Sequence, residues 1–157
     1  MNDNRHDNLR IRPAAASEVV DLRHAVLRAG LPRETAIFAG DDLPTTRHFV
    51  ATAPPEDRIV GCVTILQSLW ETQPAWQLRG MAIEPTLQRA GVGSKLLASV
   101  EQFVTGERSS PTPPAHLLWC NARVPASGFY VKHGWRIVSD VFDIPSAGPH
   151  LKMLKRV

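Results

Sequence analysis

Hydrophobic positions along the chain recur with the spacing of helices in three places. After Ser17, a helix-capping residue, the apolar residues lie three and four positions apart until Gly30: Val19, Leu22, Val26 and Ala29. A second amphipathic stretch predicts a helix over Gly91–Val104, with an apolar face of Leu96, Leu97, Val100, Phe103 and Val104. Pro125 opens a third helix that reaches about His133, with Gly134 as its left-handed cap.

Shorter apolar runs, rich in β-branched residues, predict strands between and around these helices. The strands cover Leu9–Arg12, His48–Thr52, Arg58–Leu66, Ala75–Ile83 and His116–Asn121, followed by a hairpin of Trp135–Ile144 and His150–Arg156. The connections contain many prolines and polar residues: Leu31–Pro44, with one helical turn at Arg33–Ile37, then Gln67–Pro74 and Glu107–Ala115. The order β-α-β-β-β-α-β-α-β-β predicts an α/β (α+β) fold with helices packed on a mixed sheet. We expect one domain over residues 9–157, after a disordered tail of residues 1–8.

Composition narrows the class of protein without naming a function. The 157 residues are 43% hydrophobic and 21% charged, as in an ordinary soluble globular domain. Eighteen basic and fifteen acidic residues leave a net charge of +3, which suits a small polyanionic ligand better than a nucleic acid. No apolar run approaches the roughly 20 residues of a membrane span, so we expect no membrane partner and a cytoplasmic location. Cys62 and Cys120 lie in apolar runs and lack metal-ligand spacing, which predicts reduced thiols and no metal.

The stretch Met81–Val104 carries the chemistry. A strand leads through a short loop into glycines at the start of a helix, where unpaired backbone N–H groups and the helix dipole favour an anion. Gly91 and Gly93 let phosphate oxygens approach the backbone without a Cβ in the way. The P-loop pattern fails, because Ser94-Lys95 follows Gly93 and Gln88 stands where that pattern needs glycine. The dinucleotide pattern fails at Leu96.

The pattern that remains, Q-x-x-G-x-G at Gln88–Gly93, resembles the acetyl-CoA pyrophosphate loop of the GNAT superfamily of N-acetyltransferases. A second segment also resembles that family: Asn121-Ala122-Arg123 followed by Ala126–Trp135, which matches N-x-x-A-x-x-F-Y-x-x-x-G-[FW]. Further segments, Leu78–Ala82, Leu117–Arg123 and Phe142–His150, are similar to those of a group of small bacterial GNAT proteins. The resemblance spans nearly the whole chain, and it says nothing of the acceptor.

The resemblance implies a GNAT fold, with six to seven strands, splayed central parallel strands and about four helices. It implies acetyl-CoA as co-substrate, held by the backbone of Met81, Ala82 and Ile83, by the turn Gln88, Arg89, Ala90, Gly91, Val92, Gly93 and Ser94, and by Asn121, Phe129 and Tyr130.

Tyr130, the only tyrosine, matches the family's usual general acid, so we expect it to protonate the departing thiolate. The base is open. Some family members have a glutamate at the position of Gln77, and glutamine cannot accept the proton. Glu84 and His150 are the alternatives, and histidine readily exchanges a proton near neutral pH. Each of the two also has a purely structural interpretation, as a surface carboxylate and as a hairpin histidine.

Gln77, Arg79 and Arg123 are candidate substrate-binding residues. An arginine inside an apolar strand must pair or face a cavity, so Arg79 predicts either a carboxylate-bearing substrate or an internal pair with Glu71 or Asp143. The leading hypothesis is an N-acetyltransferase acting on a primary amine of a small molecule or peptide, by direct attack in a ternary complex. The alternatives are a non-catalytic acyl-CoA sensor and, less favoured, a nucleotide-binding protein. A homodimer through residues 47–66 or 135–156 is open.

Overall fold

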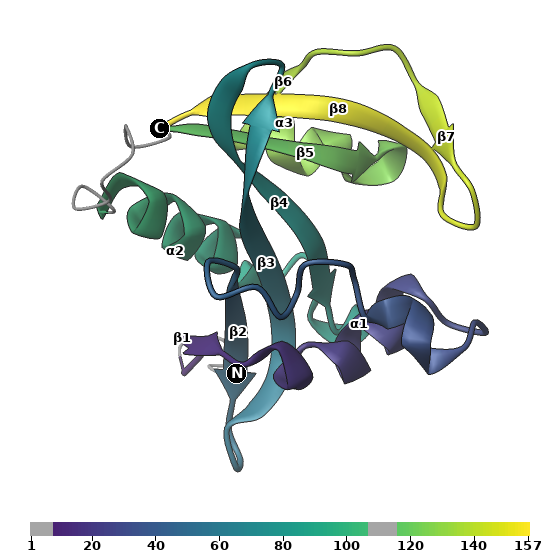
Figure 1. Ribbon diagram of the computed structural model, residues 1–157. Helices are drawn as coiled ribbons and strands as arrows, with labels where there is room; N and C mark the ends of the chain where they lie inside the picture. Colours follow the sequence, from purple (N-terminus) through teal and green to yellow (C-terminus); the bar gives the residue numbers. More distant parts are fainter. Residues whose placement is uncertain (1–7, 107–115) are drawn as a thin grey trace. The chain divides into compact units, whose positions relative to one another are not determined.

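The computed structural model describes residues 8–106 and 116–157 (Figure 1). The predicted tail, apart from Asn8, and the predicted proline-rich loop Glu107–Ala115 lie outside the described residues. The chain divides into two compact units. The first consists of the described residues up to Ile65 together with Gly80–Val100, and the second of Leu66–Arg79 with the described residues from Glu101 onward.

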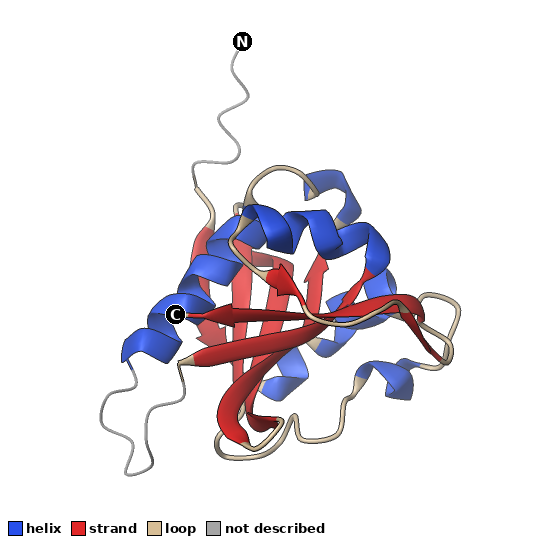
Figure 2. Ribbon diagram, turned by 90° about the horizontal axis from the view of Figure 1, so that it is seen from above, coloured by secondary structure: helices blue, strands red, loops and turns tan. Residues whose placement is uncertain are grey.

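Eight strands form one mixed sheet in the described part of the chain, in the order β1-β2-β3-β4-β5-β8-β6, with β7 also paired to β8. Figure 2 shows them in red; β8 is the strand that ends beside the C-terminal mark. The strands are β1 Arg10–Ala14, β2 Arg47–Ala53, β3 Arg58–Trp70, β4 Gln73–Ile83, β5 Leu117–Arg123, β6 Arg136–Ile137, β7 Phe142–Ile144 and β8 Gly148–Arg156. The α-helices of this part are α1 Val20–Leu27, α2 Val92–Gly106 and α3 Ser127–Lys132.

The predicted fold class is confirmed, and the numbers of elements differ slightly from those expected. The stretch predicted as one strand over Trp135–Ile144 forms two short strands, β6 and β7. Between them the hydroxyl of Ser139, not a backbone carbonyl, accepts the Lys152 N–H at 2.8 Å, which interrupts the ladder. The predicted helical turn after Pro32 is a 3-10 turn at Arg33–Ala36.

In the first unit, β1, β2 and β3 pair antiparallel, and α1 supplies part of the core. The fully buried residues Val19, Val50, Cys62 and Ala82 form one cluster of that core. At Gly61 an added Cβ would lie 2.8 Å from a methyl carbon of Val92, so the absence of a side chain lets β3 and the start of α2 approach closely.

In the second unit, β5 and β8 run antiparallel over their whole paired length, and β4 joins β5 in parallel through Trp76–Leu78. The helix α3 packs against β8 (Figure 1). Ala75, Leu117 and Leu154 form a buried cluster, covered by the half-buried Trp70 and Trp119. The core of this unit is therefore aromatic at its edge.

The segment Gln67–Pro74 was predicted as a connection, and that prediction is wrong. The strand β3 continues to Trp70, and β4 already begins at Gln73. Only Glu71 and Thr72 form the turn, with Glu71 in the left-handed region at a φ of 55°. Trp70 explains the longer strand, because its ring packs against Trp119 with centroids 5.7 Å apart.

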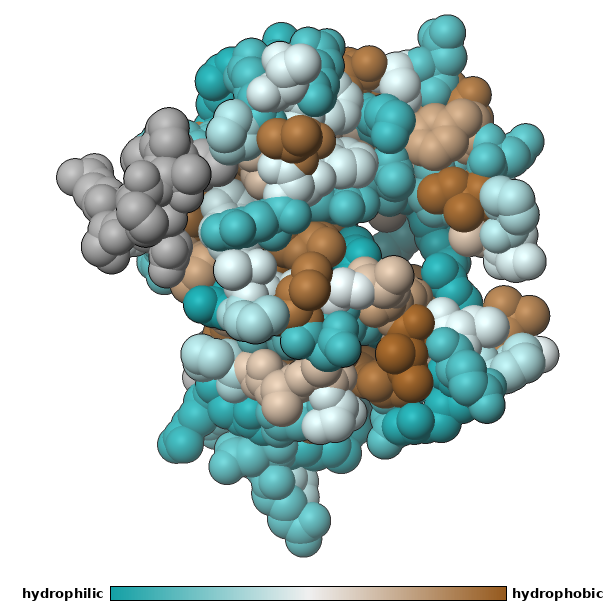
Figure 3. Space-filling view, viewed as in Figure 1, coloured by the Kyte–Doolittle hydropathy of each residue, from teal (hydrophilic) through white to brown (hydrophobic). Residues whose placement is uncertain are grey.

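Large hydrophobic side chains are exposed at separate places in the described part of the chain: Ile37, Leu43, Leu69, Val131, Ile137 and Val141. Figure 3 shows one face, on which the brown hydrophobic residues lie in small groups among teal and white ones. Among the described residues, no helix is both long enough and apolar enough to cross a membrane.

Candidate active site

A tight turn joins β4 to α2 and carries the glycines of the predicted phosphate loop. After β4 the chain makes a 3-10 turn at Pro85–Leu87, and then Arg89 and Gly91 take left-handed backbone angles, with φ of 68° and 84°. The side-chain amide of Gln88 donates a hydrogen bond to the carbonyl of Ile83 at 3.3 Å, which ties the loop to the end of β4. Gln88 therefore shapes the turn from within.

The turn presents free backbone at the start of α2, a helix of fifteen residues. An added Cβ at Gly91 would meet nothing within 4 Å, so the backbone there borders open space. The first-turn amides of a helix, here at Val92 and Gly93, have no partner inside the helix and can donate to an anion. The Ala90 N–H is different, because it donates to the Leu87 carbonyl at 3.2 Å. The geometry fits a pyrophosphate group, with Ala90 contributing shape and not a donor.

Glu84 directly follows β4 and makes polar contacts near the surface. The guanidinium of Arg58 donates to one carboxylate oxygen, and Thr86 Oγ1 donates to the other at 3.3 Å. Glu84 is about a quarter exposed. Its neighbours Met81 and Ile83 are half-buried, while the side chain of Ala82 belongs to the core. Glu84 therefore has a structural task in fixing the strand end beside the turn.

Tyr130 lies inside the second unit, on α3. It is 5% exposed, and its ring meets Phe129 and Trp135 with centroids 5.1 and 5.2 Å away. Burial raises the pKa of the phenol well above 10, and charge on the Cys120 thiol would raise the pKa further. The Tyr130 hydroxyl therefore keeps its proton throughout the physiological pH range, as a proton donor must.

The strands β5 and β8 place four polar residues on one face. Asn121 stands opposite Lys152 in the register, and Arg123 stands opposite His150. Directly opposed residues of an antiparallel pair point to the same side. Lys152 Nζ donates to Oδ1 of Asn121 at 3.1 Å, so the amide group of Asn121 is oriented by the neighbouring strand.

A backbone contact fixes the hydrogen placement of His150. This residue is 5% exposed, and its Nδ1 lies 2.7 Å from the carbonyl oxygen of Gly148. A carbonyl can only accept, so Nδ1 carries the hydrogen and the neutral ring keeps a lone pair on Nε2. Cys120 alternates with Asn121 and so points to the opposite face, where it influences Tyr130. Tyr130 and His150 thus lie on opposite faces of the same pair of strands.

The remaining predicted residues of this unit lie on β4 and α3. Gln77 and Arg79 are half-buried and alternate with the buried Trp76 and Leu78. Phe129 is half-buried, as expected for a residue that both packs and borders a ligand.

The first unit contains a buried ionic network that sequence reasoning missed. Arg23 on α1 is fully buried; its guanidinium bonds both oxygens of Asp41, at 2.6 and 3.2 Å, and Thr64 Oγ1 at 2.6 Å. His48 joins the network, with one nitrogen on Thr64 Oγ1 and the other on the Asp41 carbonyl. The available signal was position: Arg23 lies four residues after Val19, on the stripe that faces the core.

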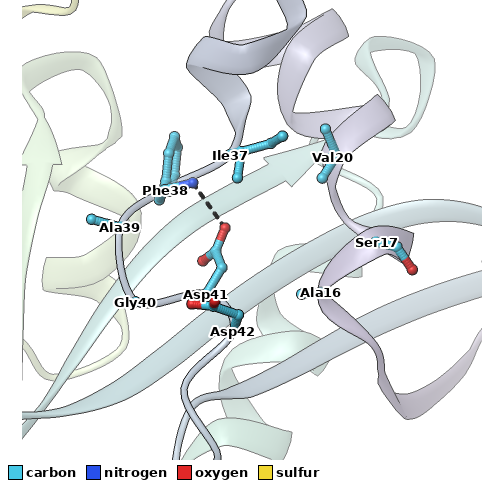
Figure 4. A pocket seen from close by; sticks show the side chains of 9 residues that line it. All are labelled: Ala16, Ser17, Val20, Ile37, Phe38, Ala39, Gly40, Asp41 and Asp42. Atoms are coloured by element: carbon cyan, nitrogen blue, oxygen red, sulfur yellow. Dashed lines mark hydrogen bonds between the residues drawn. The ribbon is translucent and has the colours of Figure 1, made fainter.

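Beside this network lies an open depression of about 430 Å³ (Figure 4). The start of α1 and the segment from Ile37 to Asp42 line it, mostly with apolar atoms. The Asp41 carboxylate accepts the Phe38 N–H at 2.9 Å, drawn as the dashed line in Figure 4, and so holds the segment in a turn. The Asp41 carboxylate is therefore engaged by groups of the first unit itself.

Comparison with known proteins agrees with this arrangement. The sequence model of the acetyltransferase (GNAT) domain matches residues 44–137. An uncharacterized N-acetyltransferase, YitI of Bacillus subtilis strain 168, is 26% identical over 157 residues, covering 94% of this chain and 95% of YitI.

Solved structures share the fold. Escherichia coli ElaA has a TM-score of 0.74 and 20% identity, covering 94% of this chain and 99% of ElaA. An aminoglycoside 6'-N-acetyltransferase complexed with coenzyme A has a TM-score of 0.70 and 14% identity, covering 94% and 96%. The family match includes the turn at Gln88–Gly93, Asn121 and Tyr130 and spans more than half of the chain. The chain therefore belongs to the GNAT family and is an N-acetyltransferase that uses acetyl-CoA.

Proposed function

We propose that the protein transfers the acetyl group of acetyl-CoA directly to a primary amine of a small molecule or peptide, in a ternary complex, with Tyr130 as general acid. The observation that carries this mechanism is the place of Tyr130 on α3, where its protonated phenol is buried against Phe129 and Trp135. The amine nitrogen attacks the thioester carbonyl carbon, the carbon–sulfur bond breaks, and the leaving thiolate takes the Tyr130 proton. No covalent acetyl-enzyme is formed.

His150 is the better supported of the two candidate bases. Its Nδ1–H is committed to the Gly148 carbonyl, so the lone pair of Nε2 is left to take the proton that the attacking amine releases. Because His150 and Tyr130 lie on opposite faces of β5, the amine approaches the thioester from one face and the thiolate leaves toward the other, beyond the end of the β4–β5 pairing at Cys120. Glu84 is held instead by Arg58 and Thr86. Both oxygens of the Glu84 carboxylate are therefore already engaged by neighbouring side chains.

The proposal assigns the cofactor to the predicted residues. The backbone of Met81, Ala82 and Ile83 pairs with the pantetheine arm, and the Gln88–Ser94 turn binds the pyrophosphate. Asn121 and Phe129 contact the thioester end. Gln77, Arg79 and Arg123 contact the acceptor, and Arg123 shares a strand face with His150.

Coenzyme A release from acetyl-CoA, measured with a thiol reagent across a panel of amines, tests the proposal. Cys62 and Cys120 are both buried, so the protein's own thiols give little background in the native state. Amine-dependent release, with an acetylated amine identified by mass spectrometry, is the expected result. Tight acetyl-CoA binding without turnover on any amine would instead make the chain a sensor of acyl-CoA.

The role of His150 is tested separately with His150→Gln, which keeps a polar side chain but has no basic nitrogen. We expect turnover to fall by about 10²-fold, with little change in KM for acetyl-CoA. Glu84→Gln is the matched variant and should keep the wild-type turnover. The reverse pattern would move the base to Glu84.

A further inference from the structure

A half-buried lysine in the second unit stands in an unusual environment. Lys152 Nζ lies 5.0 Å from the ring centre of Trp119 and 5.3 Å from that of Phe142, with Asn121 Oδ1 at 3.1 Å. We call these four residues the Lys152 cluster. In the described part of the chain Lys152 forms no ion pair, so its positive charge rests on two aromatic faces and one neutral oxygen.

The next lysine of the same strand shows what a structural lysine looks like here. Lys155 points to the opposite face, because it lies three positions further along β8. Its Nζ bonds a Glu101 carboxylate oxygen at 2.7 Å and the His133 carbonyl at 2.7 Å. Lys155 is thus neutralised and Lys152 is not, although both side chains are partly covered.

The cluster contains a second donor, the indole N–H of Trp119. The indole Nε1 of Trp119 is buried and has no hydrogen-bond partner among the described residues. A buried donor left unsatisfied is unfavourable. The cluster therefore holds a cation without a counter-charge beside a buried indole, and an anionic oxygen at Lys152 Nζ would supply that counter-charge.

The cluster lies on the face of the proposed base. Lys152 and His150 are two positions apart on β8 and point to the same side, where Arg123 also lies opposite His150. Alternate residues of a strand are about 6.5 Å apart at Cα, so the two side chains leave neighbouring points of one face. From this geometry we propose that Lys152 binds a carboxylate of the acceptor, and that the acceptor is a free amino acid. This inference rests on the proposed function, with His150 at the amine.

The charges of this face also argue against a polyamine acceptor. Lys152 would repel a second ammonium group, whereas it attracts a carboxylate. The same positive field lowers the pKa of the acceptor's ammonium group and favours the neutral amine that attacks the thioester. The aromatic walls reduce contact with water, which strengthens the bond between the ammonium and a carboxylate.

The test compares each free amino acid with its own amide, which has the same amine and side chain but no carboxylate. With the wild-type protein and acetyl-CoA, we expect kcat/KM for the best amino acid to exceed that of its amide by about 10- to 100-fold. In Lys152→Met the preference should shrink at least about fivefold, and in Lys152→Arg it should be largely kept. Arg156→Met, which removes one exposed charge from the same strand, should keep the wild-type preference.

Two further outcomes separate the inference from the proposed function. Equal turnover of amino acids and amides would overturn the carboxylate site and leave the N-acetyltransferase mechanism intact. If no amine is acetylated, binding decides instead: tryptophan fluorescence of the CoA-saturated protein is titrated with the amino acids and their amides. A carboxylate-dependent change that Lys152→Met abolishes would support the inference, and its absence would overturn it. Circular dichroism of each variant shows whether it is folded.

Discussion

At the scale of single residues, the environment of Tyr130 holds its phenol in the neutral form that the proposed general acid requires. The ring packs between Phe129 and Trp135, and burial keeps the phenol neutral. Replacing Tyr130 with phenylalanine removes one oxygen and keeps that packing. We expect Tyr130→Phe to lower kcat by about 10²-fold while KM for acetyl-CoA changes little, both measured by coenzyme A release. Unchanged turnover would remove Tyr130 from the mechanism.

The candidate site residues that the sequence identified are those recognisable from a short motif or from the residue type alone. Tyr130 and Asn121 lie in a motif readable along the chain, and His150 was selected by its residue type. The contact of Lys152 with Asn121 was not predictable, because it crosses 31 positions and depends on strand register. The pairing of Arg23 with Asp41 was hidden for the same reason, since nothing in the loop sequence indicates which carboxylate turns inward.

At the scale of elements, the turn before α2 depends on a backbone shape that few residues adopt. Gly91 has a φ of 84°, although an added Cβ would meet nothing. In Gly91→Ala the change is therefore backbone strain, on the order of 1 kcal/mol, without a steric clash. We expect KM for acetyl-CoA to rise several-fold, since the amides of the turn shift, with a modest fall in melting temperature.

Gly106→Ala is the matched control for that variant. It lies at the other end of the same helix, also has open space around the added methyl group, and has no left-handed φ. This control should leave KM for acetyl-CoA unchanged. A Gly91→Ala protein with wild-type kinetics would show that the turn does not need its left-handed geometry for binding.

The segment between α1 and β2 is held by charge more than by hydrophobic contact. Asp41 accepts bonds from buried Arg23 and from the Phe38 amide. We expect Asp41→Ala to lower the free energy of unfolding by about 3–5 kcal/mol, because Arg23 is left as a buried charge without its partner. The double variant Arg23→Met/Asp41→Ala should recover a substantial part of this loss, measured by urea denaturation. Additive losses would show that the ion pair is not the main contribution.

Element boundaries were least predictable where tertiary packing extends a strand. Composition alone indicated a loop at Gln67–Pro74, since glutamine, glutamate and proline gather there. The packing of Trp70 against Trp119 stabilises β3 to its last residue. Because Trp119 lies far away in the sequence, the local pattern around Trp70 does not indicate this contact. Helix α2 was easier, because its buried Leu96, Leu97, Val100 and Val104 follow the helical period directly.

At the scale of the whole molecule, the kinds of element were predictable and their spatial order was not. The sequence shows that a hairpin ends the chain. It does not show that β8 lies between β5 and β6, an order in which the last strand pairs with β5, about thirty residues earlier in the sequence. Such non-local pairing is decided by the sum of many contacts. The family resemblance, more than periodicity, made the topology expected.

Each compact unit contains one buried thiol, which makes the stability of the unit depend on pH. Burial raises the pKa of Cys62 in the first unit from 9.0 to about 11, and that of Cys120 in the second to about 12. In an unfolded chain both would ionise near pH 9, so above that pH the folded state binds more protons than the unfolded state. The stabilisation is complete below pH 9 and is lost as pH rises through 9 to 11. Each pKa unit corresponds to about 1.4 kcal/mol.

We therefore expect the free energy of unfolding, measured with urea, to fall by about 2–3 kcal/mol per thiol between pH 9 and 11. In Cys62→Ala/Cys120→Ala the protein is less stable at pH 7, because cavities form, but its stability falls less steeply above pH 9. An identical slope would assign the alkaline loss to other groups, Tyr130 among them.

Thiol labelling at pH 8 and increasing urea reports the unfolding around each cysteine separately, whereas a spectroscopic signal averages over both units. If Cys62 and Cys120 become reactive at the same urea concentration, the two units unfold together. If they become reactive at different concentrations, each unit unfolds alone.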